Sequence, residues 1–187
     1  MHLKYGELKR RLFANTPAML VEIGAGSGTN LRYFSPGTHL VAIEPNRQAH
    51  ATLRARAQAF GLTLELHGSP AEQIDLPSAS VDFVIGTLVF CSVQDPAKVI
   101  AEVRRVLRPG GRFACLEHVC APLGSKTYRV QQFMREPWKW AFEGCDLCRN
   151  TSLTLRAAGF AQIDIIPFEL PLYLGPVRYH ITAVCVN

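Results

Sequence analysis

The feature that most constrains this chain is a glycine-rich loop that directly follows an apolar segment. Residues 18–23 are apolar except for Glu22, and they lead into Gly-Ala-Gly-Ser-Gly at residues 24–28. Glycine lets a backbone turn tightly and approach a ligand closely, and a helix that begins after such a loop offers free N–H groups to an anion. The pattern therefore predicts a buried strand, a ligand-binding turn and a helix over residues 27–34.

The spacing around this loop separates several kinds of binding site. A dinucleotide fingerprint would need a glycine where Thr29 stands, and a P-loop would need Gly-Lys-Ser/Thr after the glycines. Instead, Glu44 stands twenty residues after Gly24, at the end of the next predicted strand, where a carboxylate can accept hydrogen bonds from ribose hydroxyls. Glu22 either binds an amino group of the ligand or braces the loop. The spacing favours a nucleoside ligand over a turn that is only structural.

The order of the remaining elements predicts an α/β fold. Apolar strand segments alternate with helical periods, which indicates a mostly parallel sheet with helices on both faces. The last two strands have no helix between them, so we expect an antiparallel hairpin at the sheet edge. The predicted strands are residues 18–23, 40–43, 62–66, 81–86, 113–117, 163–168 and 179–186, and the main helices are residues 3–14, 47–60, 96–107 and 152–158.

This order gives one seven-stranded domain over residues 1–187, with an N-terminal helical segment at residues 1–17. A turn at residues 108–111 separates the predicted helix at residues 96–107 from the predicted strand at residues 113–117. The carboxyl ends of parallel strands meet at one edge, where such sheets bind their ligands. Residues 22–28, Glu44, residues 87–90 and residues 117–118 are all expected at that edge.

Composition narrows the partners and the compartment. The net charge is +5, but the basic residues are spread over several predicted helices and no nucleic-acid-binding motif accompanies them. We therefore expect no nucleic-acid partner. The apolar runs are much shorter than the ~18–20 residues of a membrane span, and the first residues do not form a signal peptide. We expect a cytoplasmic protein without a membrane span, whose basic residues 3–14 leave peripheral membrane contact open.

The six cysteines are expected to be reduced thiols. Cys115 and Cys185 lie in apolar strand patterns and are expected in the core. Cys145 and Cys148 form a C-x-x-C pair, but a structural zinc site needs two further ligands. His118 and Cys120 supply them only if a loop folds back. We therefore expect no metal site.

Together, these residues resemble the class I S-adenosylmethionine (SAM)-dependent methyltransferases. The resemblance rests on Glu22–Gly28, Glu44–Asn46, Ala71-Glu72, Asp82, Leu107–Gly111 and the closing hairpin. Within that superfamily the chain is most similar to the alkyl-thiol S-methyltransferases, through Thr87–Gln94, Glu102–Gly111, Glu117–Val119, Gln131-Gln132, Pro137–Lys139, Gly144-Cys145 and Leu147…Arg149. The resemblance implies a Rossmann-like fold, SAM as cofactor and the thiol of a small, fairly apolar molecule as acceptor.

The resemblance also implies which residues form the site. The residues expected to contact the cofactor are Glu22, Gly24, Ala25, Gly26, Gly28, Glu44, Pro45, Asn46, Ala71, Glu72, Thr87 and Leu88. Residues 119–150, rich in aromatic side chains, are interpreted as a lid over the acceptor or as an ordinary amphipathic core helix. The residues expected to contact the acceptor are Phe90, Cys91, Gln132 and Trp138. Pro70 stands where many relatives carry an acid for the adenine amine, so adenine is expected to use the backbone of residues 71–72.

Methyl transfer to a thiol needs little general-base catalysis from the protein. The thiolate is the nucleophile, and a free thiol with a pKa of ~8.5 is already partly ionised at neutral pH. His118, oriented by Glu117, is the candidate that takes the thiol proton or stabilises the thiolate, unless it is a structural histidine. The alternatives are C- or N-methylation of a quinone precursor or phospholipid-like amine, a nicotinamide oxidoreductase, and a SAM-binding subunit without catalysis.

Overall fold

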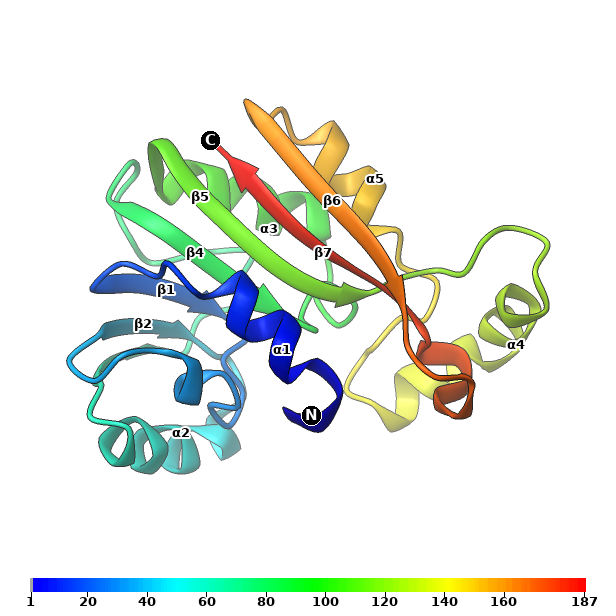
Figure 1. Cartoon of the computed structure of the whole chain (residues 1–187), viewed down its shortest axis with the longest axis horizontal. Helices are drawn as coiled ribbons and strands as arrows, with labels where there is room; N and C mark the ends of the chain where they lie inside the picture. The colour runs from blue at the N-terminus through cyan, green and yellow to red at the C-terminus, as the bar shows by residue number, and fades with distance from the viewer. Residues whose placement is uncertain (1) are drawn as a thin grey trace.

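A computed structural model of the chain describes the backbone of residues 2–187 and the side chains of that range except those of residues 2–4 and 172–174. Residue 1, the first of the predicted domain, lies outside the described residues. One sheet holds the strands in the order β3-β2-β1-β4-β5-β7-β6 (Figure 1). The strands are β1 (Met19–Ile23), β2 (His39–Ile43), β3 (Thr63–His67), β4 (Val81–Thr87), β5 (Leu107–His118), β6 (Gln162–Glu169) and β7 (Tyr179–Val186).

The sheet is parallel from β3 to β5 and antiparallel where β7 pairs with β5 and β6. This confirms the predicted mostly parallel α/β sheet with its antiparallel C-terminal hairpin. The helical elements are α1 (His2–Leu12), η1 (Leu31–Tyr33), α2 (Arg47–Ala59), α3 (Pro96–Val106), α4 (Lys126–Ala141), α5 (Thr151–Ala157) and η2 (Leu172–Val177). Within the part of the chain that is described, no helix combines the length and apolar character that a membrane crossing needs.

Helices cover both faces of the sheet. The helices α3 and α5 lie behind it in Figure 1, where Val99, Val103 and Leu155 pack into one apolar core with the strands. The other face is covered by α1 and by α2, whose Leu53 packs into the second core together with Phe13. Side chains that follow one another in a strand therefore enter different cores.

One local prediction differs from the structure, and a second is confirmed within a strand. The expected helix at residues 27–34 is a series of turns followed by the one-turn helix η1. Gly24, Gly26 and Gly28 all have positive φ, so regular helix cannot begin before residue 29, and Pro36 limits the space that is left. The expected turn at residues 108–111 is present, although these residues are counted within β5. Between two pairing points β4 advances from Val81 to Phe83 while β5 advances from Leu107 to Arg112, and Gly110 in between has a φ of +77°.

The segment predicted as a lid contains α4, which lies beyond the carboxyl end of β5 in Figure 1. The buried amide of Gln131 holds this helix in place. Its Oε1 accepts a hydrogen bond from the Ala121 N–H at 2.7 Å, and its Nε2 donates to the Pro176 carbonyl at 2.8 Å. Phe133 and Trp140 on the same helix are exposed, at 83% and 91%. An ordinary amphipathic core helix does not explain that pattern.

Candidate active site

A cavity of about 830 Å³ opens at the carboxyl ends of β1, β2 and β4. Its volume falls in the range of sites for drug-sized ligands. Many of the predicted cofactor contacts line it, namely Gly24, Gly26, Glu44, Pro45, Asn46, Ala71, Glu72 and Leu88. The sheet edge therefore gathers these residues as the sequence predicts, although they come from four separate stretches of the chain.

The glycine loop forms one wall of the cavity by close backbone approach. Gly24 has φ +63°, and a Cβ built on it would lie 2.4 Å from Cγ2 of Val89. No side chain fits there, so only glycine lets this loop meet the segment that follows β4. Ala25 and Gly28 face the protein rather than the cavity: Ala25 is 4% exposed, and a Cβ on Gly28 would meet Leu31 at 2.8 Å.

Glu44 places a carboxylate in the cavity directly beside the glycine loop. It accepts hydrogen bonds from the Gly26 N–H at 2.6 Å and from the Asn46 N–H at 2.8 Å. A carboxylate has about four acceptor positions, so it can still accept the two hydroxyls of a ribose. The N–H of Gly26 thus points at Glu44, and the predicted anion-binding helix N-terminus is absent from the described loop because no α-helix begins there.

Glu22 and Thr87 lie beneath the loop instead of lining the cavity. Asn30 connects them, because its Nδ2 donates to Glu22 Oε1 at 2.6 Å and to Thr87 Oγ1 at 2.8 Å. Lys9 on α1 donates to Asn30 Oδ1 at 2.5 Å and is 1% exposed. Of the two roles left open for Glu22, the structure supports bracing of the loop, through Asn30.

Burial shifts the titration of this network. It raises the pKa of Glu22 to about 7 and lowers the pKa of Lys9 to about 8, while each charge partly offsets the shift of the other. Sequence reasoning missed Lys9 and Asn30. The signal for Lys9 was its position within the apolar stripe of Tyr5, Leu12 and Phe13, where a solvated lysine would not be placed.

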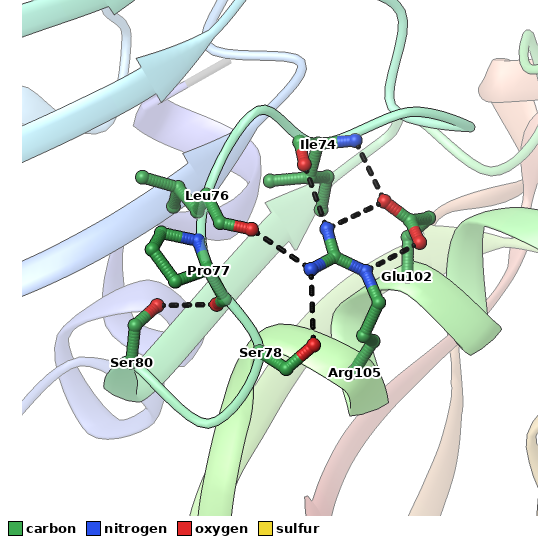
Figure 2. Close-up of polar contacts among 7 residues, drawn as sticks. All are labelled: Ile74, Leu76, Pro77, Ser78, Ser80, Glu102 and Arg105. Atoms are coloured by element: carbon green, nitrogen blue, oxygen red, sulfur yellow. Dashed lines mark hydrogen bonds and ion pairs between the residues drawn. The ribbon is translucent and has the colours of Figure 1, made fainter.

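The loop that carries Ala71 and Glu72 is fastened to α3. Glu72 Oε1 accepts hydrogen bonds from the N–H groups of Gln94 and Asp95 at 2.8 and 3.2 Å. Figure 2 shows the second fastening, in which Arg105 donates to the carbonyls of Ile74 and Leu76 at 2.7 and 2.8 Å. The side chain of Glu72 therefore holds the loop, which leaves its backbone to border the cavity.

Leu88 lies between the cavity and a second group of candidate site residues. It lines the cavity and also packs against an apolar cluster that contains Tyr5, Leu116 and Leu170. Its φ of 56° is strained for a leucine, and such strain is concentrated at functional sites. The N–H of Leu88 is held by the Leu116 carbonyl at 2.9 Å.

His118 lies beside this cluster, next to two cysteines. Its Nε2 is 3.1 Å from Sγ of Cys145, and the ligand atoms of Cys91, His118 and Cys145 all lie within 4.8 Å of one another. Two contacts hold the loop after α4 next to His118. The Asp146 N–H donates to the Cys91 carbonyl at 2.8 Å, and Arg135 on α4 forms a bidentate ion pair with the Asp146 carboxylate.

Glu117 does not orient His118. Neighbouring residues of a strand point to opposite faces, so Glu117 enters the core behind the sheet, where Oε1 accepts the Val89 N–H at 2.9 Å. Burial raises its pKa to about 7. The expected Glu117–His118 contact is therefore wrong, and Glu117 instead holds the segment that carries Leu88 and Val89 against the cavity.

The wall beside His118 is uncharged. His180, whose ring centre is 6.3 Å from that of His118, donates from Nδ1 to the Arg178 carbonyl and so accepts at Nε2 from the Tyr5 hydroxyl at 2.8 Å. Burial lowers the pKa of His180 to about 4 and raises that of Tyr5 to about 12. Both rings are therefore neutral near pH 7.

The predicted acceptor contacts divide between several places. Cys91 joins His118, and Trp138 is half-buried and stacks on Phe142 with ring centres 4.2 Å apart. Phe90 is fully buried in the core, and Gln132 is exposed on α4. Neither of these two faces a site.

The C-x-x-C motif is divided as well. The loop folds back and brings Cys145 to His118, as a metal site would require. Cys148 lies apart from them, beside Cys120. Burial raises the pKa of Cys148 to about 11, and the neighbouring Cys120 thiol contributes to the rise.

Comparisons with known proteins agree with this geometry. Residues 21–115 match the family model described as a methyltransferase domain. The chain is 37% identical to the human thiol S-methyltransferase TMT1B over 98% of its length and 76% of that protein. It is 34% identical to human thiol S-methyltransferase TMT1A over 96% of its length and 78% of that protein.

Solved structures share the fold. The crystal structure of a SAM-dependent methyltransferase from Aquifex aeolicus superposes with a TM-score of 0.66 at 18% identity, covering 99% of this chain and 90% of that one. The fold of the chain is therefore a known architecture.

Proposed function

Because the chain belongs to the SAM-dependent methyltransferases, we propose that it transfers a methyl group to the thiol of a small, fairly apolar molecule. SAM is its cofactor, as the sequence predicts. Two observations support a thiol acceptor. The relatives that span nearly the whole chain are named thiol S-methyltransferases, and His118 is buried beside neutral side chains, on the far side of Leu88 from the cavity.

The residues around the large cavity fit the cofactor. In this proposal Glu44 holds the ribose, Gly24 and Gly26 border the amino-acid part, and the backbone of Ala71 borders the adenine. Glu22 and Thr87 do not contact the cofactor in this proposal. They hold Asn30, which fixes the glycine loop from beneath. The sulfonium then lies near Leu88, which borders both the cavity and the group around His118.

The geometry favours sulfur as the nucleophile. The thiolate, the methyl carbon and the leaving sulfur must lie in line, with reacting atoms ~3–3.5 Å apart. A thiolate and a sulfonium lose both charges on the way to products, so the uncharged wall of Tyr5, Leu116 and His180 does not oppose transfer. An amine acceptor leaves a cation in the same wall, which costs free energy. We assign His118 the stabilisation of the acceptor thiolate.

Residues 119–150 are proposed as the lid over the acceptor. The helix α4 within them is anchored at Gln131 and through Arg135 at Asp146, which places Cys145 beside His118. The half-buried Trp138 is the aromatic candidate for contact with the acceptor. Gln132 is exposed on α4 and Phe90 is buried in the core, so neither is proposed as an acceptor contact.

A matched acceptor panel tests the proposal. Three compounds with one carbon skeleton that carry a thiol, a phenol or an amine are incubated with methyl-labelled SAM. The label is expected in the thioether only. Label that enters only carbon or nitrogen products would reject S-methylation and favour the C- or N-methyltransferase alternative.

The role of His118 has its own test. In His118→Ala the thiol-methylation rate is expected to fall ~10²–10⁴-fold at pH 7, the range for losing a positioned polar group. The deficit is expected to narrow at pH 9, because a thiol with a pKa of ~8.5 then ionises without help. Rates equal to wild type at both pH values would remove His118 from the mechanism.

A further inference from the structure

We propose that Cys91, His118 and Cys145 bind a zinc ion whose remaining coordination position receives the sulfur of the acceptor. The three residues come from three distant parts of the chain: the segment after β4, the end of β5 and the loop after α4. The proposal rests on the S-methylation proposed above and deepens it, because it names the group that stabilises the acceptor thiolate.

The spacing of the donor atoms suits a tetrahedral ion. Zinc binds imidazole nitrogen at about 2.0–2.1 Å and thiolate sulfur at about 2.3 Å, which places tetrahedral donors about 3.5–3.8 Å apart. Here Nε2 of His118 lies 3.1 Å from Sγ of Cys145, and all three donor atoms lie within 4.8 Å of one another. Shifts of up to about 1 Å, within reach of side-chain rotation, bring them to coordination distance.

The donor types select the metal. Two cysteines and one histidine form a soft to borderline set that suits zinc and disfavours magnesium or calcium, which prefer oxygen donors. Two thiolates also balance the charge of a divalent ion, so the loaded site is neutral. A neutral cluster is compatible with its surroundings, where Cys91 and His118 are 3% and 4% exposed.

A second observation shows an unsatisfied polar group at the site. Nδ1 of His118 is buried and has no hydrogen-bond partner among the described residues. Nε2, beside the Cys145 thiol, is the nitrogen placed to bind an ion. Nδ1–H is then the donor that a metal-bound histidine offers to an outer partner such as a water molecule.

Three protein donors leave one position of a tetrahedral ion open, which is the arrangement of catalytic rather than structural zinc. When the acceptor binds there, its S–H bond breaks, the proton goes to solvent, and the thiolate sulfur binds the ion. A sulfur lone pair then forms the new S–CH₃ bond. The CH₃–S⁺ bond of SAM breaks, its electron pair stays on the departing sulfur, and the neutral thioether leaves the metal.

The metal content of the 187-residue chain tests the site. Protein stripped with a chelator, reloaded with zinc and freed of excess is expected to hold about one zinc per chain. Cys91→Ser and Cys145→Ser are expected to lose most of it. Cys148→Ser is the matched control from the same C-x-x-C motif, and it is expected to keep the zinc of wild type because Cys148 lies beside Cys120 instead.

Cobalt substitution in the wild-type chain gives a readout that needs no variant. Co²⁺ is expected to produce the visible bands of a tetrahedral ion with thiolate ligands, and a small thiol acceptor is expected to shift them. Absence of bound metal, or equal zinc in wild type and Cys91→Ser, would overturn the site. Loss of zinc in Cys148→Ser as large as in Cys145→Ser would overturn the donor set.

Activity separates this inference from the proposed function. The metal-free chain is expected to methylate thiols at least ~10-fold more slowly than the zinc form at pH 7. If the metal-free chain works at full rate, coordination of the acceptor is overturned and S-methylation stands. If neither form methylates any thiol, the proposed function fails, while zinc content and the cobalt spectrum still decide whether the metal site exists.

Discussion

Glu22 is a carboxyl group that the fold keeps out of water, 1% exposed beneath the glycine loop. The Asn30 amide and the Lys9 ammonium compensate only part of that burial. At the residue scale, the stability of the cofactor loop therefore depends on the protonation of this one group.

The first prediction concerns Glu22→Gln and pH. The folded pKa of about 7 lies above the ordinary 4.5, so the folded state holds the proton more tightly, and stability falls as pH rises from 4.5 to 7. Glu22→Gln removes this pH dependence. The free energy of unfolding of the variant relative to wild type should therefore rise between pH 4.5 and pH 7, by up to about 3 kcal/mol at ~1.4 kcal/mol per pH unit. Urea unfolding at several pH values measures it, and parallel curves for the two proteins would contradict it.

The second prediction compares two glycines of one loop. Gly24→Ala and Gly26→Ala both place a side chain at positive φ, which costs about 1–2 kcal/mol. Only Gly24→Ala also forces Cβ to within 2.4 Å of Val89, which adds about 1–3 kcal/mol of overpacking. Urea unfolding without cofactor should rank Gly24→Ala below Gly26→Ala. Equal losses would show that the close approach to Val89 does not constrain the loop.

At the scale of elements, α3 does more than cover the sheet. Asp95 caps it by accepting hydrogen bonds from the Ala97 and Lys98 N–H groups at 3.0 and 3.1 Å, and its last turn carries Arg105. Glu102 holds the Arg105 guanidinium and also accepts the Ile74 N–H at 2.9 Å. One helix thereby fixes both ends of the loop that borders the adenine side.

The third prediction follows from that fastening. Arg105→Lys loses the planar fork that contacts two carbonyls and Glu102, so it should cost about 1–3 kcal/mol of stability and weaken SAM binding. Arg108→Lys is the control, because its ion pair with Asp82 is exposed and is expected to contribute at most about 1 kcal/mol. Urea unfolding and calorimetric titration with SAM measure both effects. Similar SAM affinity in the two variants would contradict the proposed role of the loop.

How far the sequence predicts an element depends on how local its cause is. The strands and the helices α2 and α3 follow from apolar periods within single segments. The start of β5 is predicted at residue 113 and observed at Leu107, and the other bounds of these elements differ by at most one residue from those observed. The helix expected after the glycine loop failed because three positive-φ residues prevent it locally, while the apolar positions Leu31 and Phe34 imitate a helical period.

At the scale of the whole molecule, the two halves of the site differ in how far the sequence predicts them. The cofactor half was predictable, because Gly24, Glu44 and Leu88 each follow a parallel strand and such strand ends meet at one edge. The group around His118 was not, because Cys145 reaches it through a loop held by Asp146 and Arg135. No pattern within a single segment records a contact of that kind.

The most direct test of the central claim is a crystal structure of the chain with S-adenosylhomocysteine. The ribose hydroxyls are expected on the Glu44 carboxylate, the adenine beside Ala71, and the homocysteine sulfur next to Leu88, turned toward His118. A molecule bound elsewhere, or one whose sulfur turns away from His118, would contradict the placement of both the cofactor and the acceptor.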